Sequence, residues 1–150
     1  MVGRTYRYMT AEPLYPFGFG LSYSHFEYSD LKLDKTQLRQ GEAVHAIVTV
    51  KNTGEVVSDE VVQLYLTDVE ASARTPISAL KGFHRSRLEP GQQRTVAFTI
   101  TPEMMSVVDE NGDSRLEPGQ FRVTIGGCSP GKRSTDLGAP QPVQATFIVQ

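Results

Sequence analysis

Apolar and polar residues alternate with a period of two in short runs between residues 24 and 150, and turn-forming residues separate these runs. Successive side chains of a β-strand point to opposite faces of the sheet, so the alternation predicts strands with one buried face. No long stripe of helical spacing competes with this pattern. The apolar residues that mark the successive strands are Phe26, Tyr28, Leu31 and Leu33; Val44, Ala46, Val48 and Val50; Val62, Leu64 and Leu66; Ile77, Leu80 and Phe83; Val96, Phe98 and Ile100; Met105 and Val107; Phe121, Val123 and Ile125; and Val143, Ala145, Phe147 and Val149.

Turn-forming sequences lie where the runs end. The phrase Leu-Glu-Pro-Gly-Gln occurs at residues 88–92 and again at 116–120, each time directly before an alternating run. Proline presets φ for the first central position of a type II turn and glycine accepts the positive φ of the second, so both copies predict a chain reversal. A phase shift at Ser29-Asp30 predicts a β-bulge, and the glycines and prolines from Gly126 to Pro142 predict an irregular loop. Regularly spaced strands and turns are typical of an all-β sandwich.

The segment Tyr15–Tyr23 carries large apolar side chains in a stretch too rich in glycine and proline to bury them by itself. Burying one such side chain is worth ~1.5 to 3 kcal/mol, so leaving all of them in water would forfeit on the order of 10 kcal/mol, comparable to the stability of a small domain. We therefore divide the chain into a docking segment, residues 1–23, and a sandwich, residues 24–150. The expected docking anchors are Tyr15, Phe17, Phe19, Leu21 and Tyr23.

Composition narrows the classes of partner and location. The 150 residues fit one domain with a single core. A net charge of −2 without a basic stripe argues against a nucleic acid, and no apolar run approaches the ~20 residues that span a membrane. The first residues lack the apolar centre of a signal peptide. Cys128 is the single cysteine, which excludes an internal disulfide and is compatible with a reducing, cytoplasmic location.

Candidate catalytic and metal-binding groups are scattered. The stretch Asp109–Asp113 has alternating oxygen ligands that suit calcium, but its Asn-Gly pair between alternating runs is a stronger signal for a hairpin turn. Cys128 has no neighbouring histidine, no Gly-x-Ser-x-Gly elbow is present, and none of the carboxylates lies in an evident cleft. We expect no catalytic residue, no metal site and no cofactor, with structural histidines and a solvated basic face. These histidines and basic residues are His25, His45, His84, Arg74, Lys81, Arg85 and Arg87.

Several short motifs occur in a fixed order and together resemble one family. They are Pro13–Tyr23, Val48–Gly54, Glu60–Leu66, Leu80–Phe83, Leu88–Gly91, Val107–Gly112 and Glu117–Gly119. In this respect the chain is similar to the C-terminal fibronectin type III-like domain of family 3 glycoside hydrolases of the β-glucosidase or β-xylosidase type. The resemblance implies an immunoglobulin-like, fibronectin type III-like antiparallel β-sandwich of about seven to eight strands with an irregular N-terminal extension.

The resemblance also implies a function. Hydrolysis of a glycosidic bond needs two positioned carboxyl groups, which in this family come from an N-terminal (β/α)8 barrel and, usually, the following α/β domain. The resemblance covers neither of these domains. It therefore implies a non-catalytic accessory domain whose partners are the barrel and α/β domains of a parent hydrolase, with residues 1–23 along the α/β domain. Met104–Ser106 and Cys128–Pro142 depart from the family pattern.

Two other functions stay open on the sequence alone. A carbohydrate-binding module would stack an oligo- or polysaccharide on exposed aromatic rings. Its candidate sugar contact is Tyr65, which lies on the strand face opposite Leu64 and Leu66. A self-associating interaction domain would use the same exposed apolar patch as the docking segment.

Overall fold

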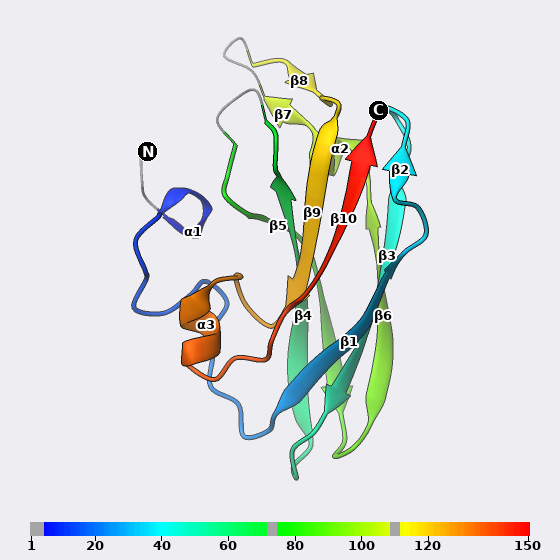
Figure 1. Cartoon of the computed structure of the whole chain (residues 1–150). Helices are drawn as coiled ribbons and strands as arrows, with labels where there is room; N and C mark the ends of the chain where they lie inside the picture. Colours follow the sequence, from blue (N-terminus) through cyan, green and yellow to red (C-terminus); the bar gives the residue numbers. More distant parts are fainter. Residues whose placement is uncertain (1–4, 72–74, 109–111) are drawn as a thin grey trace.

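The computed structural model describes residues 5–71, 75–108 and 112–150. In these ranges the strands form two packed sheets and a small separate hairpin, and the helices are short (Figure 1). None of the helices in the described ranges is long and apolar enough to cross a bilayer. The elements are α1 (Thr5–Tyr8), β1 (Phe26–Leu33), β2 (Gln37–Leu38), β3 (Val44–Asn52), β4 (Ser58–Asp68), β5 (Ala79–Leu88), β6 (Gln93–Ile100), α2 (Pro102–Met105), β7 (Val107–Val108), β8 (Ser114–Arg115), β9 (Gly119–Gly126), α3 (Lys132–Asp136) and β10 (Val143–Val149).

The two sheets have three and five strands. The first follows the order β1-β3-β6 and the second the order β2-β10-β9-β4-β5, while β7 and β8 pair with each other. Neighbouring strands run antiparallel except for β2, which pairs in parallel with β10. This arrangement confirms the predicted all-β, fibronectin type III-like sandwich. The strand β5 forms one edge of the larger sheet.

The core lies between the two sheets and consists of the inward faces of their strands. Val44 and Val48 of β3 are fully buried, and on the other sheet the rings of Phe121 and Phe147 stack with their centroids 5.5 Å apart. Because alternate residues of a strand face the same side, strands with clean alternation reveal their inward faces directly. The predicted inward residues of β3, β9 and β10 accordingly lie in this core or pack against it, except Ala145 of β10, which is half-buried.

Both predicted irregularities occur in the structure. β1 shifts its register against β3 between Ser29 and Lys32, and Asp30 has a φ of 54°, so the bulge is confirmed. The loop from Gly126 to Pro142 is less irregular than expected, because it contains the helix α3. Neither feature alters the order of the strands.

The two copies of the repeated phrase differ in conformation. Between β5 and β6, Gly91 has a φ of 75° and the Gln92 amide donates a hydrogen bond to the Glu89 carbonyl at 3.0 Å, which confirms a type II turn. In the second copy Gly119 has a φ of 159°, far from the ~80° of that turn, and it already belongs to β9. The predicted hairpin turn at Asp109–Asp113 falls largely on residues 109–111, which lie outside the described residues.

The fourth strand differs from its prediction. Ile77 precedes β5, and its side chain and that of Phe83 are 51% and 70% exposed. Phe83 pairs with Gln63 of β4 on the outer face of the sheet. The predicted core residues were three positions apart, whereas residues on one face of a strand are two apart, so the spacing gave no reliable inward face. The buried residues of β5 are Ala79, Ser86 and Leu88.

The short helices and the two-residue strands β2 and β8 were not predicted. Met105 belongs to the helix α2 and not to a strand, and the helix begins at Pro102, a residue that suits the first helical position because its missing N–H has no partner there in any case. β2 and β8 contain two residues each, too few for alternation to show. A period-two pattern therefore cannot identify these two strands.

Candidate docking surface

The N-terminal segment lies along the outer face of the five-stranded sheet and beside α3 (Figure 1). Backbone hydrogen bonds attach it at two separate places. The Ile77 amide donates to the Arg7 carbonyl at 2.7 Å, and the Ser129 amide donates to the Phe17 carbonyl at 2.8 Å. The Leu80 amide also donates to the Tyr6 hydroxyl at 3.3 Å. The segment is thus an outer layer of the domain and not a free tether.

Aromatic rings connect this segment to the sheet. Tyr6 stacks on Phe17 with 4.5 Å between ring centroids and meets Tyr65 of β4 edge-on at 6.1 Å. Tyr65 is consequently only 1% exposed. The prediction that Tyr65 offers its ring to a sugar is wrong: the alternation placed the ring on the outer face, but the chain's own N-terminal segment covers that face.

A series of buried hydrogen bonds lies beneath the N-terminal segment. The Tyr65 hydroxyl donates to Gln63 Oε1 at 2.6 Å, and Gln63 Nε2 donates to the Gly127 carbonyl at 2.6 Å. Both side chains are buried, and burial raises the pKa of Tyr65. Gly18 passes directly over Gln63: its φ is +77°, and a Cβ there would lie 2.7 Å from Gln63 Oε1. Glycine is therefore required at this point for both the backbone angle and the close approach.

The predicted anchors differ in how far the chain itself covers them. Phe17 is 49% exposed because one face stacks on Tyr6, and Tyr15 packs in parallel against Phe19 with centroids 6.1 Å apart while remaining 70% exposed. Leu21 and Tyr23 are 96% and 99% exposed. The structure thus leaves the side chains of Leu21 and Tyr23 in water at the end of the segment, where the energetic argument from sequence places a docking surface.

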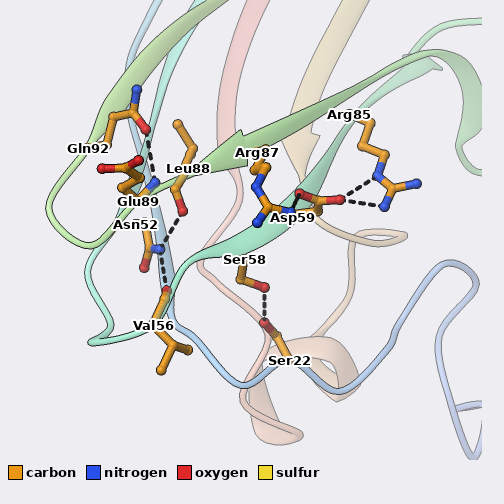
Figure 2. Close-up of polar contacts among 10 residues, drawn as sticks. All are labelled: Ser22, Asn52, Val56, Ser58, Asp59, Arg85, Arg87, Leu88, Glu89 and Gln92. Carbon is orange, nitrogen blue, oxygen red and sulfur yellow. Dashed lines mark hydrogen bonds and ion pairs between the residues drawn. The ribbon is translucent and has the colours of Figure 1, made fainter.

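Hydrogen bonds fix the point where this stretch enters the sandwich (Figure 2). The Ser22 and Ser58 hydroxyls lie 3.2 Å apart, and the Ser24 hydroxyl donates to Asn52 Oδ1 at 2.5 Å. Asn52 is fully buried, and its Nδ2 donates to the carbonyls of Val56 and Leu88 at 2.8 and 3.0 Å. The direction in which the exposed side chains leave the sandwich is set by this network.

A carboxylate of β4 lies in a cavity. Glu60 lines a cavity of about 280 Å³ between residues 19–26 and the loop that follows α3. The Tyr28 hydroxyl donates to Glu60 Oε1 at 2.5 Å, and burial raises the pKa of both groups. The expectation that no carboxylate lies in a cleft is therefore wrong. Glu60 is the only acidic residue among the described residues that line this cavity, whereas glycoside hydrolysis needs a pair.

The expected basic face surrounds one aspartate (Figure 2). The Arg85 guanidinium donates to Asp59 Oδ2 from both Nε, at 2.9 Å, and Nη2, while Arg87 Nη1 lies 4.0 Å from Asp59 Oδ1. Both arginine side chains are exposed. Arg74 lies outside the described residues, and burial, with a smaller effect from Arg7, lowers the pKa of Lys81.

The remaining candidate groups of the described residues are not arranged as a metal site or a nucleophilic site. Over the described ranges no three His, Cys, Asp or Glu side chains are grouped so that they could hold a metal ion. Cys128 is buried, and burial raises the pKa of its thiol, which disfavours the reactive thiolate. His45 Nδ1 lies 3.1 Å from the Thr99 hydroxyl on an exposed strand surface, a structural arrangement.

Comparison with known proteins agrees with this architecture. Residues 60–129 match the family model of the fibronectin type III-like domain. The chain is 44% identical over 132 residues to a putative beta-xylosidase of Formosa agariphila, with 88% of the chain aligned, and 41% identical over 149 residues to thermostable beta-glucosidase B of Acetivibrio thermocellus, with 97% aligned. The chain thus has a fibronectin type III-like fold and is similar along most of its length to one part of these two proteins. It spans 18% and 19% of the length of these two relatives.

A solved structure shows the same relationship in three dimensions. The crystal structure of a beta-glucosidase from Listeria innocua in complex with glucose superposes with a TM-score of 0.80 at 35% sequence identity, over 95% of this chain and 18% of that one. The chain therefore matches a small part of that beta-glucosidase.

Proposed function

We propose that this fibronectin type III-like domain is a non-catalytic accessory domain of a family 3 glycoside hydrolase of the β-glucosidase or β-xylosidase type, and that it packs on the catalytic domains of that enzyme. The observation that carries the proposal is the exposed apolar stretch at the end of the N-terminal segment, where Leu21 and Tyr23 lie almost wholly in water. The relatives support it, because the chain aligns with about a fifth of their length, and the remainder is long enough to hold catalytic domains.

The energetic gain from docking is substantial. Covering Tyr15, Leu21 and Tyr23 would be worth ~1.5 to 3 kcal/mol for each side chain, before the cost of association is subtracted. The segment is already attached to the domain through hydrogen bonds from Ile77 to Arg7 and from Ser129 to Phe17, so little backbone order has to be gained when the partner arrives. A surface that is ordered in advance converts more of its burial into affinity.

The chemistry of hydrolysis is assigned to the partner. Glu60 and its hydrogen-bonding tyrosine form a lone acidic site, and the reaction requires one carboxyl group to protonate the leaving oxygen and another to attack the sugar or to activate water. We expect the purified chain to show no turnover of aryl β-glucosides or β-xylosides.

Association with the catalytic part of the parent hydrolase tests the proposal. The purified chain is titrated into that part, prepared without this domain, and binding is followed by calorimetry. We expect saturable binding that the pair of substitutions Leu21→Ala and Tyr23→Ala weakens at least about tenfold. Ile47→Ala is the matched control, because Ile47 is an exposed apolar residue on the other sheet. Absence of binding, or equal weakening by the control, would overturn the proposal.

A further inference from the structure

A second apolar surface lies on the outer face of β4 and β5, next to the docking segment. Its members are cross-strand neighbours, since Val61 pairs with Arg85, and Phe83 pairs with Gln63. Phe83 is 70% exposed and lies on the edge strand of the sheet. We define this surface, the β4–β5 patch, by Val61, Phe83, Arg85 and Arg87.

The patch is continuous with the docking segment. Gln63, the cross-strand partner of Phe83, is the residue over which Gly18 passes, so the segment borders the patch along β4. Phe17, directly before Gly18 in sequence, still exposes half of its ring. The end of the segment meets β4 at Ser58, and the charged side chains Asp59, Arg85 and Arg87 lie between that point and Phe83.

The charges of the patch are not balanced. Arg85 and Arg87 share a single carboxylate, that of Asp59, which is itself partly buried (Figure 2). Each arginine side chain is more than two-thirds exposed. Two guanidinium groups for one carboxylate leave a net positive charge beside the exposed phenyl ring. Arginine presents a planar fork of donors that suits a second carboxylate.

Protection of the sheet edge does not explain this composition. Charged side chains on an edge strand discourage pairing with other chains, and Arg85 and Arg87 would serve that purpose alone. A phenylalanine with most of its surface in water works against such protection, because exposed apolar patches promote association. An aromatic centre with arginines at its rim is instead the composition of an interface.

We infer that the β4–β5 patch is a second part of the docking surface, and that its occupant is an apolar surface bordered by carboxylates on the neighbouring domain of the parent hydrolase. The inference rests on the proposed function and adds to it the position and charge of the contact. Phe83 would be the buried anchor, while Arg85 and Arg87 would form ion pairs with the partner at the rim.

The binding titration described above tests the patch with three variants. We expect Phe83→Ala to weaken binding at least about tenfold, as loss of a central aromatic anchor does. We expect the pair Arg85→Gln and Arg87→Gln to weaken binding several-fold at low salt and to reduce its dependence on ionic strength. Asp59→Asn makes the patch more positive, so it should strengthen binding at low salt. Arg94→Gln, at an exposed position near the start of β6 in the other sheet, is the charge control.

The outcomes separate the two proposals. If Leu21→Ala with Tyr23→Ala weakens binding while all three patch variants behave like Arg94→Gln, the docking function stands and the inference fails. If binding weakens in Asp59→Asn as well as in the arginine variant, the arginines act by supporting β4 and β5, and the inference also fails. Self-association that Phe83→Ala abolishes, without binding to the hydrolase, would make a second copy the occupant and overturn both proposals. Far-ultraviolet circular dichroism of each variant checks its fold.

Discussion

Gly18→Ala is expected to detach the N-terminal segment from the sheet while leaving the sandwich folded. The φ of Gly18 is +77°, a conformation that costs a residue with a Cβ about 1 to 2 kcal/mol. The new methyl group would also lie 2.7 Å from Gln63 Oε1, so the buried Gln63 must move and give up hydrogen bonds to Tyr65 or Gly127. A buried polar group left unpaired costs about 1 to 3 kcal/mol. The sum is about 2 to 5 kcal/mol.

Hydrogen exchange measures this effect locally. The amide of Ser129 is bonded to the segment through the Phe17 carbonyl, so its protection reports attachment. A loss of about 2 kcal/mol or more corresponds to a decrease in protection of at least about 30-fold, whereas the amides of β3 in the first sheet should change little. Gly20→Ala is the matched control, because a methyl group at Gly20 would have no neighbour within 4 Å and the φ of Gly20 is not positive.

The reasoning would be refuted by unchanged protection at Ser129 in Gly18→Ala, since the contact with Gln63 would then not hold the segment. Equal losses in Gly18→Ala and Gly20→Ala would refute it as well, because the effect would come from the loss of glycine flexibility in general. Uniform loss of protection across both sheets would show that the segment and the sandwich unfold together.

Two further predictions concern the sandwich itself. Asn52→Ala removes the donor from the buried Leu88 carbonyl and from the partly buried Val56 carbonyl, so urea unfolding should show a loss of about 2 to 4 kcal/mol. Thr53→Ala, which removes an exposed hydrogen bond, should cost far less, and similar losses would contradict the role of Asn52. The raised pKa of Glu60 means that its favourable contribution is complete below the ordinary pKa of glutamate and is lost as pH rises through the folded value. Stability relative to Glu60→Gln should therefore fall as the pH rises above the ordinary pKa of glutamate, about 4.5, and an increase in stability instead would show that the folded pKa is lowered.

The sequence predicted the elements that depend on local alternation. β3, β9 and β10 have one apolar face each, so a period of two was enough to find them and to orient their core residues. β5 was found but not oriented, because its apolar residues do not alternate and Phe83 faces outward. A local pattern carries no information where the burial of a strand depends on its register with a neighbour.

The candidate site depended on contacts between residues far apart in the chain. Alternation correctly placed Tyr65 on the outer face, but its cover comes from Tyr6, 59 positions earlier. The cavity around Glu60 likewise requires residues 19–26 to meet the loop after α3. The exposure of Leu21 and Tyr23 was foreseeable, because their segment lacks the length and regularity to bury them.

The attachment of the N-terminal segment also means that the domain includes residues that precede the first strand of the sandwich. The contacts that join this segment to the rest of the domain begin at Tyr6, well before the first strand of the sandwich at Phe26. A shortened chain that begins at residue 24 would keep both sheets but would expose Tyr65 and Gln63 to water. Measurements on it would therefore describe a protein with a different outer face.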